Sequence, residues 1–322
     1  MENDFLIRKQ IEFVNYRLGQ FIHFNSATFQ FNSTEMKDWE YDVENFQTAR
    51  KYPFDPKDFC PDELDCAQWA EASHLLGAKF AALTTKHHEG FCLWPTSTTS
   101  HCVSSSPVST DIVGEYLEAY RSRGIKAGLY FSMLDLTHHI GKCSCTKEQI
   151  DFTKQQLSEL LTNYGPIPFL IIDGWQADWG GPSYKDMPFE EINSFVKSIQ
   201  PSCLLLNHSC ETSLAHTEIV FYENAAGQEV DDTFSGPGCS GNILTSCWFW
   251  RSSDPTSELK SVQWAIDKIN QMNKHNVSFL LNASPNIHGK IDNNMMMRFE
   301  EIGNCFKEPN PLTFIPKGWI IR

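Results

Sequence analysis

The chain has 322 residues, 11 cysteines and a formal net charge of -14. A chain of this length can bury most of the surface that its unfolded form exposes, so it needs neither a disulfide framework nor a structural metal for stability. The negative charge argues against nucleic acid and anionic membranes as partners. We expect a single domain over residues 1–322.

Short apolar segments recur along the chain, and polar stretches with helical patterns separate them. Eight of these segments are predicted to be strands: residues 18–24, 80–86, 127–132, 168–174, 203–209, 218–224, 246–250 and 277–284. Their nearly continuous apolar character is typical of strands that are covered on both faces.

Amphipathic patterns between these segments predict helices over residues 64–76, 112–123, 147–164, 189–199 and 258–274. The alternation of strand and helix favours a parallel sheet with crossover helices, and eight strands indicate a closed (β/α)8 barrel. A doubly wound open sheet is the alternative. No glycine-rich phosphate-binding motif follows any of the strands, which excludes the nucleotide-binding versions of that alternative.

The carboxyl ends of barrel strands form the rim that holds active sites, so polar residues at these ends are candidates by position. The predicted strand ends place these residues on the rim: His23, Lys86, His87, His88, Tyr130, Asp173, Asn207, His208, Glu223, Trp248 and Asn282.

Two carboxylates stand out in this set. Asp173 follows four apolar residues, where an unpartnered charge would be costly to bury. It is either a nucleophile, base or metal ligand at the barrel mouth, or a structural helix cap. Glu223 ends a later strand, and two carboxylates from different strands suit glycoside hydrolysis. A solvated rim glutamate is the alternative for Glu223, and Glu229 in a following loop could fill the same role.

The adjacent histidines His87 and His88 raise the question of a metal site. Neighbouring residues of a strand point to opposite faces, so a metal on a strand prefers alternate histidines to an adjacent pair. Hydrogen bonding to substrate hydroxyls fits the pair better, because imidazole both donates and accepts. We therefore expect no metal here, and the remaining alternative is a pair of core histidines.

The cysteines are scattered and form no CxxC pair, which favours a reducing compartment and gives a structural zinc site little support. Cys143 and Cys145 are too close in sequence for an ordinary disulfide. The N-terminus lacks the charged and apolar regions of a signal peptide, and no apolar stretch is long enough to span a membrane. We expect a cytoplasmic protein, or a secreted or periplasmic one if a leader was removed. The sequons at Asn32, Asn207, Asn276 and Asn282 are then chance matches.

Several stretches together resemble the α-L-fucosidases of glycoside hydrolase family 29. They include "FIHF", "TTKHHEGFCLWP", "PFLIIDGW" and "LLNASPNIHGKID", and the resemblance covers residues 17–303. It implies an α/β barrel, a retaining mechanism and no cofactor. Asp173 matches the family's nucleophile, although "IIDG" stands where "WFDG" is usual.

The same resemblance implies substrate-binding residues. His23, His87, His88 and Tyr130 match positions that hold the fucose hydroxyls, and Trp248 resembles an aromatic-rich segment near the methyl face of the sugar. Some family members carry a C-terminal β-sandwich, and we expect none in this chain.

The general acid/base is the point where the resemblance fails. Family members commonly place a glutamate a short way before the tryptophan of the aromatic segment, but Gly238 and Cys239 stand there. Glu223 is the preferred substitute because a strand end is held more rigidly than a loop, and Glu229 is the alternative.

The expected function is that of an exo-acting, retaining α-L-fucosidase acting on a fucosylated glycan, with the two carboxyl groups roughly 5–5.5 Å apart. The rival is a fucose-binding protein with a degenerate site. Loops 32–51 and 176–187 are predicted to set linkage and aglycone preference, and the sequence gives no indication of oligomeric state.

Overall fold

The computed structural model describes residues 2–30, 54–142, 145–177, 180–208 and 211–322. In this part of the chain, eight strands form one sheet in the order β5-β4-β3-β2-β1-β8-β7-β6, and its ladders are parallel. The strands are β1 (Leu18–Ile22), β2 (Phe80–Lys86), β3 (Lys126–Ser132), β4 (Phe169–Asp173), β5 (Leu204–Asn207), β6 (Val220–Glu223), β7 (Gly238–Asn242) and β8 (Val277–Ala283).

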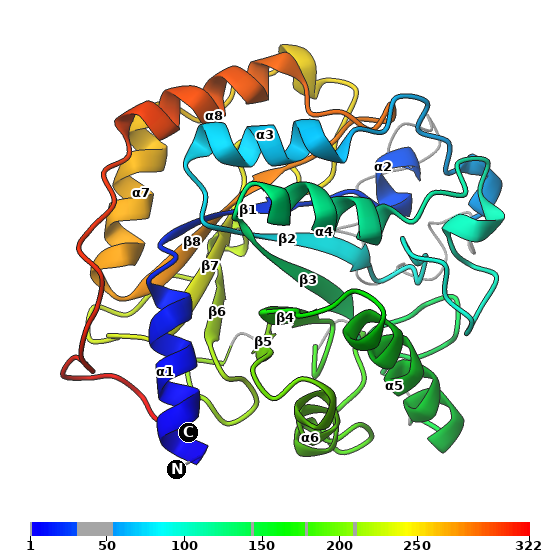
Figure 1. The fold of residues 1–322 in the computed structure, drawn as a ribbon, viewed down its shortest axis with the longest axis horizontal. Helices are drawn as coiled ribbons and strands as arrows, with labels where there is room; N and C mark the ends of the chain where they lie inside the picture. Colours follow the sequence, from blue (N-terminus) through cyan, green and yellow to red (C-terminus); the bar gives the residue numbers. More distant parts are fainter. Residues whose placement is uncertain (1, 31–53, 143–144, 178–179, 209–210) are drawn as a thin grey trace.

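The sheet curves into a nearly closed barrel with helices around it (Figure 1). At the seam between β5 and β6, the backbone N–H of Glu218 donates to the Leu205 carbonyl at 2.9 Å. The Leu205 N–H in turn donates to the Glu218 carboxylate at 2.8 Å. The predicted (β/α)8 barrel is confirmed, and the open sheet is excluded.

The described residues form eight α-helices. They are α1 (Glu2–Val14), α2 (Ser26–Gln30), α3 (Cys66–Leu76), α4 (Ile112–Ser122), α5 (Lys147–Thr162), α6 (Phe189–Ile199), α7 (Val262–Lys274) and α8 (Asn293–Cys305). Of these, α3 to α7 correspond to the five predicted helices. Side-chain caps set several starts: Asp65 accepts from the Gln68 N–H, and Ser261 accepts from the Trp264 N–H. These caps explain why α3 and α7 begin later than the apolar pattern alone predicts.

The helix α1, which was not predicted, covers the N-terminal end of the barrel. The ring of Phe13 packs edge-on against Phe80 and Phe169, the first residues of β2 and β4, with centroids 5.2 Å apart in each pair. The Gln10 side-chain amide donates to the Glu218 carbonyl at 2.7 Å. Since this end is covered and the interior is filled with side chains, the opposite end of the barrel is left for a site.

The predicted seventh strand was wrong. Residues 246–250 form a loop, and the strand is β7, with the sequence GCSGN. A strand of small residues carries no apolar signal, whereas the aromatic loop after it does. Packing favours the small residues, because a Cβ on Gly238 would lie 2.7 Å from Val277 Cγ2 and one on Gly241 would lie 3.1 Å from the Trp248 ring.

The nine cysteines in the described residues have free thiols, and Cys143 lies outside them. Asn207 and Asn282 are buried, so the folded chain does not present these two sequons, while Asn32 also lies outside the described residues. No described helix combines the length and the apolar character of a membrane span.

Candidate active site

Asp173 is the last residue of β4 and lies at the carboxyl end of the barrel. The register pairs it with Ser132 of β3, so Tyr130, two residues earlier, points to the same face. The Tyr130 hydroxyl donates to Asp173 Oδ2 at 2.7 Å, and the Gly174 N–H donates to Oδ1 at 2.6 Å. Gly174 has a φ of 64°, and a Cβ there would lie 2.8 Å from that of Leu134, so only glycine fits this turn.

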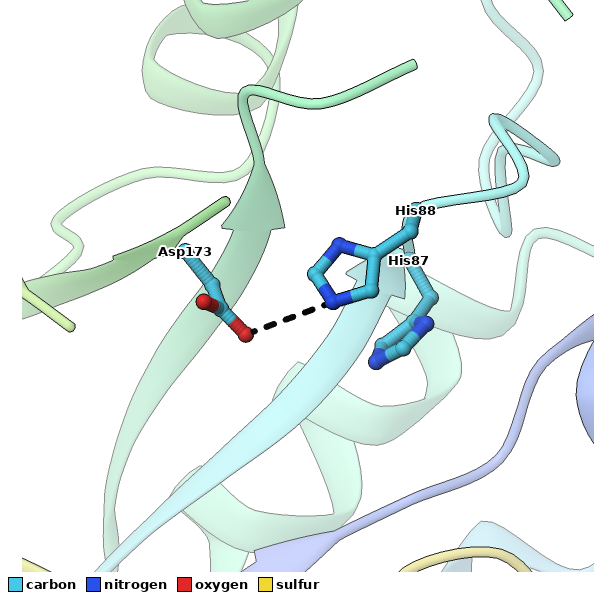
Figure 2. A group of neighbouring side chains, drawn as sticks. All are labelled: His87, His88 and Asp173. Atoms are coloured by element: carbon cyan, nitrogen blue, oxygen red, sulfur yellow. Dashed lines mark ion pairs between the residues drawn. The ribbon is translucent and has the colours of Figure 1, made fainter. Parts of the chain in front are cut away.

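Two histidines flank the carboxylate of Asp173. His88 Nε2 lies 3.7 Å from Oδ2, an ion pair drawn as the dashed line in Figure 2, and His208 Nδ1 lies 3.4 Å from Oδ1. Ser132 orients the His88 ring from the side away from Asp173. His88 Nδ1 lies 2.7 Å from the Ser132 hydroxyl, and this hydroxyl donates to the Leu134 carbonyl. Because the Ser132 hydroxyl proton points to the Leu134 carbonyl, the hydrogen bond between His88 and Ser132 must be donated by His88 Nδ1.

These neighbours determine the charge of the site. Burial by itself raises the pKa of Asp173, but His208, His88 and the Tyr130 hydroxyl outweigh it and hold this pKa well below its ordinary value. Burial by itself lowers the pKa of His208, but Asp173 and Glu223 outweigh it and raise this pKa well above the ordinary value. Burial and the adjacent Asp173 raise the pKa of Tyr130, which keeps it a hydrogen-bond donor.

Glu223 ends β6 and lies on the far side of the same imidazole. His208 Nε2 is 3.1 Å from Glu223 Oε2, and the Trp248 indole N–H donates to Oε1 at 2.9 Å. The Nε2 atom is buried, and its contact with Glu223 is an ion pair. The two carboxylates therefore flank one ring, and the Glu223 side chain retains 23% of its exposure.

Glu229 lies elsewhere. Its carboxylate is 57% exposed and pairs at 3.3 Å with Lys268, a residue of α7. The structure thus brings Glu223, and not Glu229, next to the partners of Asp173.

His23 lies opposite, at the end of β1, and it is fixed in one tautomer. The Asn282 amide nitrogen donates to the Trp248 carbonyl at 2.7 Å, so its Oδ1 accepts from His23 Nδ1 at 2.6 Å. Burial lowers the pKa of His23 to about 3, and the ring is neutral near pH 7. It stacks on the Trp248 ring at 4.8 Å. A neutral imidazole with one fixed acceptor nitrogen is suited to binding a hydroxyl.

His87 lies among the aromatic side chains that line this side of the site. Its ring stacks on Tyr130 at 5.5 Å with an interplanar angle of 12°, and it packs edge-on against Phe249 at 4.9 Å. The aromatic loop that was mistaken for a strand therefore supplies two walls of the site, Trp248 and Phe249.

A metal ion is the other possible use of part of this cluster. Ligand atoms of His87, His88 and Asp173 all lie within 4.8 Å of one another (Figure 2). A cation there would compete with Tyr130 and Gly174 for the Asp173 oxygens and would adjoin His208, whose pKa is raised. The arrangement fits hydroxyl binding better, and the absence of a metal stays a prediction.

Of the two loops predicted to set specificity, 32–51 lies outside the described residues. In the other, Tyr184 accepts a hydrogen bond from the Asn207 amide at 2.8 Å and stacks on His216 at 3.9 Å. This loop therefore packs directly beside the segment that carries His208.

The structure gathers the predicted site residues at one rim, with the exception of Glu229, and their roles stay predictions. It adds His208, which the sequence placed at a strand end without assigning it a role. Position at the end of β5 was the available signal for it.

The strand ends of this (β/α)8 barrel hold an ionised aspartate and a glutamate. These are the residues that glycoside hydrolysis requires, so the fold and the site together are typical of the class of glycoside hydrolase barrels. Residues 8–309 match the family model described as Alpha-L-fucosidase, and the chain belongs to this family.

Relatives with curated descriptions agree with this assignment. Alpha-L-fucosidase 1 of Arabidopsis thaliana is 30% identical over 284 residues, which cover 79% of this chain and 54% of that protein. The tissue alpha-L-fucosidase of Mus musculus is 35% identical over 154 residues, 43% of this chain and 33% of that protein. The chain spans about half the length of the plant relatives that it matches.

Solved structures of other fucosidases share the fold. Alpha-L-fucosidase isoenzyme 1 from Paenibacillus thiaminolyticus superposes with a TM-score of 0.76 at 22% identity, covering 93% of this chain and 76% of that one. A family 29 fucosidase from Bacteroides thetaiotaomicron, solved as a trapped covalent intermediate, gives 0.75 at 21% identity, covering 92% and 74%. The single-domain organisation predicted for this chain stays a prediction.

Proposed function

We propose that this protein is an exo-acting, retaining α-L-fucosidase that releases terminal α-L-fucose from glycans and uses no cofactor. The observation that carries the proposal is the buried, ionised Asp173 with Glu223 across one imidazole, in a chain of the α-L-fucosidase family. The Bacteroides thetaiotaomicron relative was trapped as a covalent intermediate with 2-fluoro-fucosyl fluoride, which supports covalent chemistry here as well.

In the first step, a carboxylate oxygen of Asp173 forms a bond to the anomeric carbon while the bond to the leaving oxygen breaks. Glu223 gives a proton to that oxygen. In the second step, Glu223 takes a proton from a water molecule, whose oxygen attacks the anomeric carbon and releases Asp173. Two inversions return the original configuration, so the product retains it.

The remaining residues hold the sugar. A ring nitrogen of His87 lies within 4.8 Å of a carboxylate oxygen of Asp173, and the His23 ring lies 6.3 Å from that of His87. Trp248 supplies an aromatic ring that suits the apolar side of a deoxy sugar. Hydrogen bonds to the hydroxyls accelerate the reaction to the extent that they strengthen as positive charge develops on the sugar ring.

Hydrolysis of 4-nitrophenyl α-L-fucoside tests this proposal. NMR identifies which anomer of fucose is released first, before the anomers interconvert. We expect α-L-fucose from the wild type, and a loss of kcat/KM of about 10⁴-fold or more in Asp173→Ala. Asp151→Ala, an exposed carboxylate of α5, is the matched control. Binding of L-fucose without hydrolysis would identify a fucose-binding protein instead, and loss of activity on chelation would require a metal.

A further inference from the structure

His208 is the one side chain that contacts both candidate catalytic carboxylates in the described structure. Its ring is held by position, since it follows β5 directly and its backbone N–H donates to the Ile172 carbonyl at 2.7 Å. That bond ties it to the residue before Asp173. Its ring also packs against Phe221 at 4.7 Å, two residues before Glu223. Both strands that carry the carboxylates therefore fix the place of this imidazole.

The two ring nitrogens have different surroundings. Nδ1 faces Asp173 Oδ1 at 3.4 Å, and that oxygen also accepts the Gly174 N–H. Nε2 is buried and faces Glu223 Oε2 at 3.1 Å. The carboxylate that Nε2 faces is partly exposed, with 23% of its side-chain surface accessible, so a proton passed from Nε2 to Glu223 can be handed on towards a substrate.

The neighbours of Glu223 show where such a proton can be stored. The Trp248 indole N–H occupies Oε1, and it donates but does not release its proton in this pH range. The imidazole at Oε2 is the neighbour that carries a proton and can pass it to Glu223 when the charges of the site change. The arrangement therefore gives Glu223 one partner for orientation and another for proton exchange.

We propose that His208 is the positioning residue that couples the two carboxylates: its Nδ1 side holds Asp173, and its Nε2 side stores the proton that Glu223 delivers. This inference rests on the proposed function. As the leaving group departs, the Nε2 proton moves to Glu223 Oε2 and a proton passes from Glu223 to the leaving oxygen. When water attacks, its proton returns through Glu223 to Nε2, so the cycle balances.

Variants that keep one nitrogen at a time separate the two contacts. The amide of Asn in His208→Asn reaches as far as Nδ1 and keeps a donor for Asp173, but it loses the contact to Glu223. The amide of Gln in His208→Gln reaches as far as Nε2 and loses the contact to Asp173. His208→Phe keeps a ring and loses both.

Two substrates then read out the two roles. Methyl α-L-fucoside has a leaving group that requires protonation, whereas α-L-fucosyl fluoride depends on it far less. For His208→Asn we expect kcat/KM to fall about 100-fold on the methyl glycoside and to stay within about threefold on the fluoride. His208→Gln and His208→Phe should lose activity on both substrates. The ratio of the two substrates is measured within one protein sample, so partial misfolding does not change it.

Equal losses on both substrates in His208→Asn would show a merely structural role and overturn the inference. So would wild-type activity in His208→Phe, and in that case the proposed function would still stand. A wild type that hydrolyses neither substrate would remove the proposed function together with this inference.

Discussion

Each oxygen of Asp173 is occupied by a protein donor that comes from a different segment. Tyr130 of β3 and the backbone of Gly174 supply the two hydrogen bonds, and His88 and His208 approach from either side. The donors lower the pKa of this carboxyl group although its side chain is almost fully buried. Asp173, the proposed nucleophile, is therefore ionised before any substrate arrives.

The acid/base assignment is the residue-scale claim with the clearest test. In Glu223→Ala, hydrolysis of an unactivated fucoside should fall by about 10²- to 10⁴-fold, because the leaving group is no longer protonated. Added azide should restore turnover of an activated aryl fucoside and give fucosyl azide with the configuration of the substrate, which NMR of the product determines.

Glu229→Ala is the control for this variant, since Glu229 is exposed and paired with Lys268. It should keep wild-type activity and show no response to azide. If Glu229→Ala loses activity and responds to azide while Glu223→Ala does not, the assignment is wrong.

Most residues of the rim could be predicted because the ends of the apolar strands can be located in the sequence. Asp173, Tyr130 and the histidines follow long apolar runs, so their place needs only the barrel rule. The role of His208 could not be predicted in this way, because its partners lie on two other strands, β4 and β6. Which side chains meet across a rim depends on register and side-chain direction.

At the scale of elements, a buried ion pair ties β2 to the loop after β3. Lys86 Nζ lies 3.0 Å from Asp135 Oδ2 and 3.0 Å from Gln156 Oε1, with neither charged side chain exposed. Burial by itself raises the pKa of Asp135, but Lys86 and His138 outweigh it and lower this pKa to about 2. Lys86 directly precedes His87, so the pair anchors the segment that carries the two adjacent histidines.

Lys86→Met should therefore destabilise the fold by about 3–5 kcal/mol, because it leaves a buried carboxylate without its partner. Adding Asp135→Asn should recover part of this loss, and urea unfolding of the two variants measures the difference. A Lys86→Met variant as stable as the wild type would contradict this account of the pair.

The same pair predicts a dependence on pH. The folded pKa of Asp135 lies below its ordinary value of 3.8, so the ion pair stabilises the fold above that pH. This contribution is lost as the pH falls from about 3.8 towards 2.

Elements were predictable where hydrophobic periodicity marks them, as for α4 and α6. The strand β7 was missed because its small residues fit against Trp248 and Val277, a packing requirement that hydrophobicity does not record. The helices α1 and α8 were also missed. Both lie at the ends of the pattern of alternating strand and helix, where that pattern no longer supports a prediction.

At the scale of the whole molecule, one end of the barrel contributes to stability and the other holds the candidate active site. The helix α1 covers the N-terminal end through Phe13, and the candidate active site occupies the carboxyl end. Stability and activity should then respond to different substitutions.

Phe13→Ala should lower the free energy of unfolding by about 3–5 kcal/mol, since it opens a cavity against Phe80 and Phe169. The kcat/KM of the folded protein should stay unchanged. Phe5→Ala, on the same helix but 38% exposed, is the control and should change stability little. A large drop in kcat/KM for folded Phe13→Ala would show that the two ends are coupled.

The central claim is that Asp173 forms a covalent bond to fucose, and trapping that bond tests it most directly. The protein is incubated with 2-fluoro-fucosyl fluoride, using Glu223→Gln to slow breakdown of the intermediate, and is then digested and analysed by mass spectrometry. We predict one added 2-fluorofucosyl group on the peptide that contains Asp173, and none in Asp173→Ala. An adduct on any other residue, or hydrolysis of aryl fucosides by the wild type with no adduct, would contradict the account.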